Sequence, residues 1–231
     1  TRLWPRHVVS DGRGTLLGLA QGQHPEKTQF FQVLYCLAST DAGQTWTPRG
    51  LVADDPERST WGYSAIEADL RLTPKGELIC VCRTDRAAVT PGDTRHTVQM
   101  RSSDSGKTWS RPEPIAPYSV RPQLISLDCG ATALLYGRPG VHLLFSDPEY
   151  QQWHTPQALI GRHVDELKHF SHWAGGNLYG LAFGNDTCGN ARAVVTGPDR
   201  FLVAYSDFNM RDDQGRQRKV IKVQEVLVRS P

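Results

Sequence analysis

The sequence predicts an all-β fold made of repeated four-stranded antiparallel units. Short apolar or alternating segments bounded by Gly, Pro, Asp and Ser dominate the chain, and few segments show helical periodicity. A strand-turn-strand packet recurs along the sequence. The pattern Ser-x-Asp-x-Gly-x-Thr-Trp occurs twice, as "STDAGQTW" from residue 39 and "SSDSGKTW" from residue 102. Four-stranded units repeated at about 40–60 residues are typical of propeller blades.

The packets can be followed in order along the chain. Each contains a strand, a turn with Gly, Pro or Asp, and a more apolar strand, as in "LRLTPKGELICVCR" and "LISLDCGATALLYGR". The expected strands cover residues 14–20, 31–38, 65–72, 77–83, 96–102, 123–127, 132–137, 141–146, 178–183, 191–196, 201–206 and 220–228. Residues 164–172 form the one segment where we expect a helical turn. Nothing marks a linker, so we expect a single domain over residues 1–231.

The repeated motif favours a structural role. In both copies an Asp precedes a Gly by two positions, where its carboxylate can accept a backbone hydrogen bond two residues on, and Gly takes a positive φ at no steric cost. The Trp supplies a large ring that packs against its own blade. The residues assigned to this turn are Asp41, Gly43, Trp46, Asp104, Gly106 and Trp109. The segment "HLLFSDPEYQQWHTP" is interpreted as a degenerate third copy that keeps Asp147 and Trp153.

The motif resembles the Asp-box, or bacterial neuraminidase repeat, of the sialidase superfamily. "GTLLGLAQG" is similar to the first-blade hairpin of that family, and "GELICVCRTD" and "YGRPGVHLLFSD" are similar to its later blades. The resemblance covers nearly all of the chain except about residues 160–190. It implies a β-propeller, which is six-bladed in the catalytic members. Only about four blades are recognisable here, so either some blades are degenerate or the chain is a partial or shortened propeller.

The resemblance also implies a substrate site at the mouth of the propeller. Sialidases use three Arg residues that clamp the substrate carboxylate, because guanidinium groups bind carboxylates in a forked geometry. Arg83, Arg121 and Arg192 lie near strand ends, where their side chains are expected to meet around one axis. Arg138, in "YGRPG", is a further candidate, and Trp173 is expected to contact the sugar.

The family also implies a Tyr nucleophile helped by a Glu, and an Asp acid/base. "WGYSAIEADLRL" is the best match for the first pair, with Tyr63 before an inner strand and Glu67 within it. Glu67 and Asp69 alternate and are expected to face the same side of the strand. Asp85, two residues after Arg83, is the candidate acid/base. The expected function is therefore an exo-acting glycoside hydrolase of the sialidase type, on terminal sialic acid or a related sugar.

A non-catalytic propeller that binds glycan or protein at the same mouth is the alternative. The family's early Arg-Ile-Pro is not present as such, and the first-blade loop "GQHPEKTQFF" carries Glu26 but no Asp. A propeller enzyme with different glycan chemistry, such as a lyase or a neutral-sugar hydrolase, is a third reading. Fold alone does not separate these functions.

Composition excludes several other classes. The formal net charge is +2 and no basic run carries interleaved aromatics, which argues against nucleic acid as the main partner. No segment approaches the length of a membrane helix. The five Cys fit no zinc spacing and are expected to be buried free thiols, and we expect neither a metal nor a cofactor. A glycan or glycoconjugate is the expected partner, while compartment and oligomeric state stay open.

Overall fold

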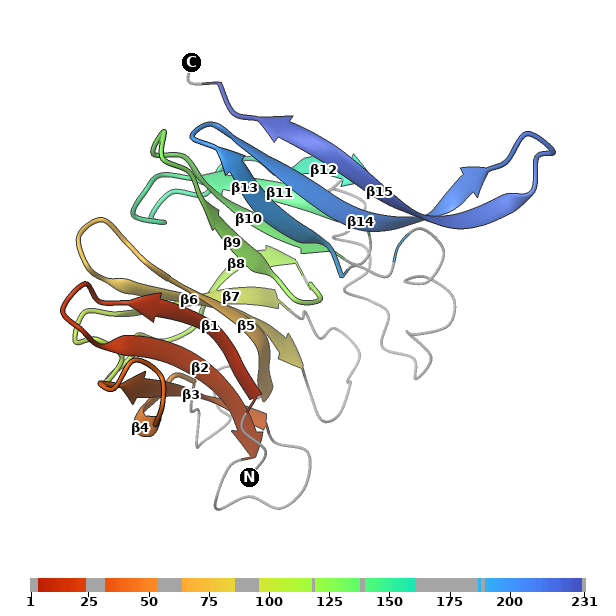
Figure 1. Cartoon of the computed structure of the whole chain (residues 1–231). Coiled ribbons are helices and arrows are strands. Elements are labelled where there is room, and N and C mark those ends of the chain that lie inside the picture. The colour runs from red at the N-terminus through yellow and green to blue at the C-terminus, as the bar shows by residue number, and fades with distance from the viewer. Residues whose placement is uncertain are drawn as a thin grey trace. The chain divides into compact units, whose positions relative to one another are not determined.

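The structure, a computed structural model, describes residues 4–23, 32–53, 64–85, 96–117, 119–137, 140–160, 187 and 190–229. Within these residues the regular structure consists of β-strands alone, arranged in four sheets (Figure 1). The chain divides into two compact units. Unit 1 comprises Thr1–Ala88 and Arg95–Ala116, and unit 2 comprises Val89–Thr94 and Pro117–Pro231. The prediction of one domain over the whole chain stays a prediction.

Unit 1 contains two four-stranded antiparallel sheets in simple sequential order. The first sheet consists of β1 (Trp4–Ser10), β2 (Leu16–Gln23), β3 (Gln32–Ser39) and β4 (Thr47–Leu51). The second consists of β5 (Ser64–Leu72), β6 (Leu78–Asp85), β7 (His96–Ser102) and β8 (Glu113–Pro117). Apolar side chains of both sheets form one core, with Leu17, Leu34, Leu70 and Met100 almost inaccessible to solvent. Burial of this core supplies the main driving force for packing the two sheets.

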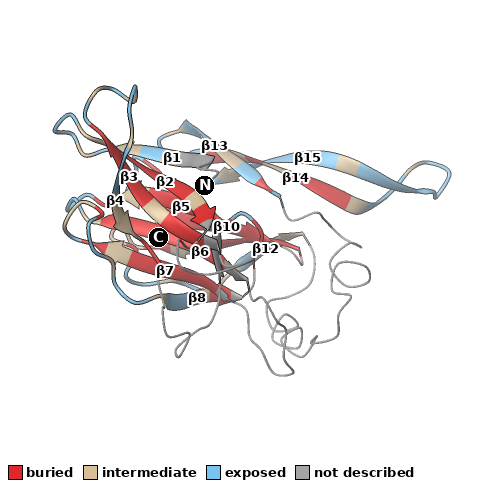
Figure 2. Ribbon diagram, turned by 90° about the horizontal axis from the view of Figure 1, so that it is seen from below, coloured by how far each residue is buried: buried red, intermediate tan, exposed pale blue. Residues whose placement is uncertain are grey.

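Unit 2 contains a four-stranded and a three-stranded antiparallel sheet. The first consists of β9 (Gln123–Ser126), β10 (Thr132–Gly137), β11 (Val141–Ser146) and β12 (Gln157–Ile160). The second consists of β13 (Arg192–Gly197), β14 (Arg200–Arg211) and β15 (Gln217–Leu227). Both sheets contribute to a second core that includes Leu135, Leu143, Phe201 and Val203. The tip of the β14–β15 hairpin, around residues 211–219, is largely exposed (Figure 2).

The predicted antiparallel units of four strands are confirmed in three sheets, and the described part of the fourth sheet contains three strands. The predicted strands at 96–102, 132–137 and 141–146 match β7, β10 and β11. The short fourth strands β4, β8 and β12 escaped assignment as separate ranges, because each holds only four or five residues with weak alternation. The expected strand at 178–183 and the expected helical turn at 164–172 lie outside the described residues.

The two copies of the repeated motif fold into the same turn. In the first, the Ser39 hydroxyl donates to Asp41 and accepts from the Gly43 N–H, and the Thr45 N–H and hydroxyl donate to Asp41. The second copy repeats each bond at Ser102, Asp104, Gly106 and Thr108, and the matching distances differ by at most 0.1 Å. Each Trp indole donates to the carbonyl of its motif Gly, at 3.1 and 3.2 Å.

This geometry corrects one detail of the sequence interpretation. The Asp carboxylate binds the Thr four residues on, while the Gly N–H two residues on is bonded to the Ser hydroxyl. The reason is that the residues between Asp and Thr form a left-handed turn, with φ of 58° at Ala42 and 89° at Gly43. The expected structural role holds. Trp46 lies over Gly18 of β2 in its own sheet. The degenerate third copy also closes on its Asp, since Asp147 accepts from the N–H groups of Glu149, Gln151 and Gln152.

The cysteine prediction is confirmed for three residues and wrong for one. Cys36, Cys80 and Cys82 are buried free thiols of unit 1, whereas Cys129 is free and exposed. Cys129 follows Asp128 in the turn between β9 and β10, where the backbone runs at the surface. Cys188 lies outside the described residues.

Candidate functional site

In three sheets, a residue in the left-handed region lies within the first strand or shortly before it. These residues are His7 in β1 with φ of 36°, Glu67 in β5 with φ of 52°, and Arg121 before β9 with φ of 49°. Non-glycine residues avoid this region, and each such residue costs about 1–3 kcal/mol. The pairing register shifts at His7 and again at Glu67, as expected for β-bulges. Bulges of this kind redirect side chains and are frequent beside functional sites.

Glu67 and Arg83 form an ion pair within unit 1. Arg83 Nη1 donates to Glu67 Oε2 at 3.0 Å, and the side chains are only 10% and 17% exposed. Arg83 lies on β6 opposite Ile66, while Glu67 lies in the bulge between Ile66 and Asp69. The bulge interrupts strict alternation, so Glu67 and Asp69 bind different partners. The structure thus brings together two residues that the sequence assigned to one site.

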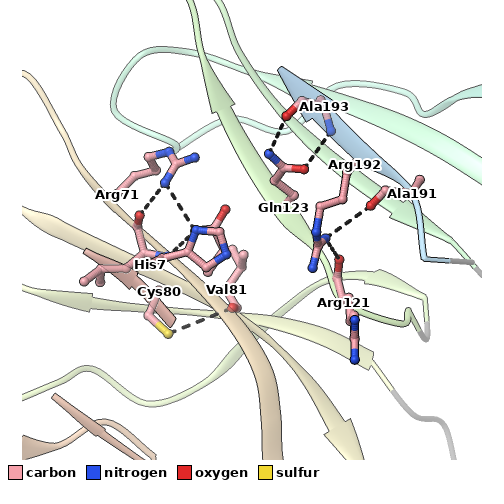
Figure 3. A network of polar contacts seen from close by, with 11 residues as sticks. His7, Arg71, Cys80, Val81, Arg121, Gln123, Ala191, Arg192 and Ala193 are labelled. Carbon is pink, nitrogen blue, oxygen red and sulfur yellow. Dashed lines mark hydrogen bonds and ion pairs between the residues drawn. The ribbon is translucent and has the colours of Figure 1, made fainter. Parts of the chain in front are cut away.

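Asp69 is the centre of a second polar group. Its Oδ1 lies 2.8 Å from His7 Nδ1 and 3.2 Å from Arg71 Nη1, and it accepts from the Leu70 N–H at 2.7 Å. Asp69 is fully buried, whereas the His7 side chain is 28% exposed. Figure 3 shows His7 and Arg71 side by side. The contact joins the first strands of the two sheets of unit 1, because His7 belongs to β1 and Asp69 to β5.

Gln21 gives β5 a further link to the first sheet. The Glu67 N–H lies 3.5 Å from Gln21 Oε1, and Gln21 belongs to β2. β5 also packs against β1, β2 and β3. Glu67 is therefore held through its side chain by Arg83 and at its backbone by the neighbouring sheet. Such support from two sides is what a preorganised binding group requires.

Arg121 and Arg192 are neighbours in unit 2. Arg192 Nη1 donates to the Arg121 carbonyl at 3.0 Å and to the Ala191 carbonyl at 3.2 Å (Figure 3). Arg192 thereby holds the left-handed backbone of Arg121, and both residues are exposed. Gln123 fixes the same region, because its amide exchanges two hydrogen bonds with the backbone of Ala193, at 2.9 and 2.8 Å. The guanidinium of Arg192 is thus engaged in holding a loop.

The other predicted site residues are described only in part or not at all. Asp85 is the last residue of β6 and pairs with Ser64 in the backbone register, but its side chain is outside the described part. Tyr63, Arg138 and Trp173 lie outside the described residues. Their catalytic and ligand-binding roles therefore stay predictions, as does the convergence of Arg83, Arg121 and Arg192.

Sequence reasoning missed His7, Gln21 and Gln123. These residues link β1 to β5, β2 to β5, and β9 to β13. Their partners lie on other strands, so the local sequence pattern carries no signal for these contacts.

Two features are absent from the residues that the structure describes. Among them no group of three or more His, Cys, Asp or Glu side chains has a geometry that would hold a metal ion. In the same part of the chain, no helix has the length and apolar character needed to cross a membrane.

Comparison with solved structures establishes the fold. A protein of unknown function from Dyadobacter fermentans is 22% identical with a TM-score of 0.67, over 97% of this chain and 54% of that protein. The GH93 α-L-arabinofuranosidase of Fusarium graminearum, solved with arabinobiose, is 14% identical with a TM-score of 0.58, over 99% of this chain and 63% of the enzyme. A GH43_1 enzyme from Xanthomonas citri, complexed with xylotriose, is 13% identical with a TM-score of 0.60, over 97% of this chain and 71% of that enzyme.

These similarities confirm the predicted fold class, an all-β propeller of four-stranded antiparallel blades. No protein-family model and no curated protein sequence matches the chain. The chain spans less than two thirds of the length of the Dyadobacter protein and of the Fusarium enzyme. At these identities the comparison concerns fold, and the resemblance to sialidases stays a prediction from the sequence.

Proposed function

We propose that the chain carries a glycoside-hydrolase site at the start of β5, where Glu67 and Arg83 contact a terminal sugar. The observation that supports this most directly is the Glu67–Arg83 ion pair, which is largely buried and built on a left-handed bulge. Glycoside hydrolysis uses carboxyl groups beside the scissile bond. Several proteins of similar fold, at low identity, are named as glycosidases, and two were solved with arabinobiose or xylotriose.

Within this proposal the individual residues have separate roles. Glu67 acts with Tyr63 as the nucleophile pair, and Asp85 is the acid/base. Arg83 binds the sugar while its guanidinium is oriented by Glu67, since a charge-assisted hydrogen bond at 3.0 Å fixes its direction. In unit 2, the ligand-binding roles predicted for Arg121, Arg138, Arg192 and Trp173 are kept, and Arg192 Nη1 also donates to the Arg121 carbonyl.

The identity of the sugar is a separate part of the proposal. The sialidase resemblance favours terminal sialic acid or a related acidic sugar, since Arg residues bind carboxylates. A panel of aryl glycosides with sialyl, α-L-arabinofuranosyl and β-xylosyl groups tests this choice. We expect release of the aryl alcohol from the sialoside. Release from the pentosides alone would show that the substrate carries a neutral sugar and not sialic acid. The Y63F, E67Q and D85N variants should each lose at least about 100-fold in kcat/KM, the usual scale for acid–base groups.

Non-catalytic glycan binding is the second candidate. It is favoured by a specific observation: both carboxylates of β5 already have cationic or hydrogen-bonding partners, Arg83 for Glu67, and His7 and Arg71 for Asp69. In this candidate function, the two carboxylates orient neighbouring groups and take no part in proton transfer. Saturable binding on a glycan array without release from any aryl glycoside would support this candidate over the hydrolase.

A further inference from the structure

We propose that His7 is a further sugar-binding residue of the β5 site, positioned by Asp69 and contacting a sugar hydroxyl through Nε2. This inference rests on the proposed function, because it adds a third group to the site proposed at Glu67 and Arg83. The residue was not singled out by the sequence. It lies on β1, the neighbouring first strand of unit 1, and reaches β5 through its imidazole.

The tautomer of His7 follows from the surroundings of Asp69. The same carboxylate oxygen lies within 3.2 Å of His7 Nδ1, the Leu70 N–H and the Arg71 guanidinium. The Leu70 N–H and the Arg71 guanidinium can only donate hydrogen bonds, so the Asp69 oxygen accepts from both. His7 therefore carries its hydrogen on Nδ1. In the neutral imidazole the other nitrogen, Nε2, is then a hydrogen-bond acceptor.

The position of the ring suits contact with a ligand. Asp69 is fully buried, while the His7 side chain keeps 28% of its surface exposed, so the imidazole spans from the interior to the surface. The backbone of His7 is held at φ of 36° beside a bulge, and Glu67 has the same kind of backbone on the adjacent strand. Two strained polar residues on neighbouring first strands indicate selection for side-chain placement, since each costs stability.

A purely structural role is the competing explanation, because the His7–Asp69 contact also joins two sheets. The variant H7N distinguishes the structural role of His7 from its proposed role in sugar binding. The Asn amide nitrogen can take the place of Nδ1 and keep the donor to Asp69, but nothing replaces Nε2. Asn also tolerates a left-handed backbone well. The matched control is E77Q, which breaks the Glu77–Arg101 ion pair at the opposite end of the β6 and β7 strands.

The experiment combines binding with chemical labelling. Titration with arabinobiose and with sialyllactose should show about tenfold weaker sugar binding by H7N than by the wild type. E77Q should bind like the wild type, and the urea midpoint of H7N should be unchanged. In the wild type, diethyl pyrocarbonate should acylate His7, and the sugar that binds should protect it, as measured by mass spectrometry.

The outcomes separate the inference from the proposed function. Unchanged sugar binding by H7N, or acylation of His7 that no bound sugar slows, would overturn the role of His7 even if the wild type hydrolyses a glycoside. Protection of His7 in a protein that releases nothing from any aryl glycoside would support His7 and reject the hydrolase. A neutral imidazole protonated at Nε2 in ¹⁵N NMR spectra would also overturn the inference.

Discussion

Arg83 on β6 and Glu67 in the bulge of β5 face each other at 3.0 Å, with little of either side chain exposed to solvent. The pair lies at the end of the sheet opposite the repeated motif turn, which follows β7 at Ser102. Within unit 1, the repeated motif turn and the candidate site thus lie at opposite ends of the same sheet. The hydrogen-bonded motif turn therefore lies at one end of the sheet, and the proposed ligand contacts lie at the other.

Breaking the pair on one side should cost more stability than removing both partners. R83M removes the Arg83 cation from the largely buried Glu67 carboxylate, and we expect a loss of about 3 kcal/mol. The double variant R83M/E67L should recover part of this loss, because it removes the Glu67 charge as well. Urea unfolding of the wild type, R83M, E67L and R83M/E67L measures the coupling energy between Arg83 and Glu67. E77Q, whose pair is more exposed, should lose less than about 1 kcal/mol. Additive losses in the cycle would contradict this account.

The motif turns should make stability sensitive to acid. Hydrogen bonds from the side chain and backbone of Thr45 lower the pKa of Asp41 from 3.8 to about 2. Hydrogen bonds from Thr108 likewise hold the pKa of Asp104 well below its ordinary value. Because the folded state has the lower pKa, each carboxylate stabilises the fold above pH 3.8, and this contribution disappears as the pH falls through the folded pKa.

D41N and D104N should therefore be less stable than the wild type at pH 7, and the difference should shrink as the pH approaches 2. Urea midpoints measured over this range provide the test. D213N, at an exposed position of the β14–β15 turn, is the matched control and should follow the wild type throughout. A difference that stays constant from pH 7 to pH 2 would show that the charge of these carboxylates is not what stabilises the turns.

Gly50 should be intolerant of any side chain. A Cβ at this position of β4 would meet the backbone carbonyl oxygens of Gly106 and Lys107 in the second motif turn, which cannot move as a side chain can. G50A should therefore lose about 1–3 kcal/mol in unfolding free energy. G197A is the control, because a Cβ there meets only the flexible side chain of Arg200. Equal effects of the two substitutions would argue against the close approach of β4 to the second motif turn.

The thiols should fall into two classes of reactivity. Burial raises the pKa of Cys36 to about 11 and raises that of Cys82 further, so both stay protonated and inert. Cys129 is exposed and free. In a C188S background, one thiol should react with a disulfide reagent under native conditions, and C129S should abolish that reaction. The remaining thiols should react only in denaturant. Rapid native labelling of the C129S/C188S variant would contradict the burial of Cys36, Cys80 and Cys82.

The fold could be predicted from the sequence, but the candidate site only in part. Alternating strands and the Ser-x-Asp-x-Gly-x-Thr-Trp pattern are local signals, so the blades and the motif turns could be predicted. The left-handed bulge at Glu67 has no local signature, because Glu seldom adopts this backbone, and only the pairing of β5 with β6 reveals it. The His7–Asp69 contact joins residues far apart in sequence, and the packing of two sheets brings them together. The ligand-binding role of Arg192 stays a prediction, and the hydrogen bond from its Nη1 to the Arg121 carbonyl could not be read from the sequence.

The position of bound sugar tests the central claim most directly. Crystals of the chain soaked with sialyllactose or arabinobiose should show the sugar beside Glu67 and Arg83, with one hydroxyl within hydrogen-bond distance of His7 Nε2. Sugar bound elsewhere on the chain, with the Glu67–Arg83 pair left uncovered, would contradict a glycoside-binding site at the start of β5.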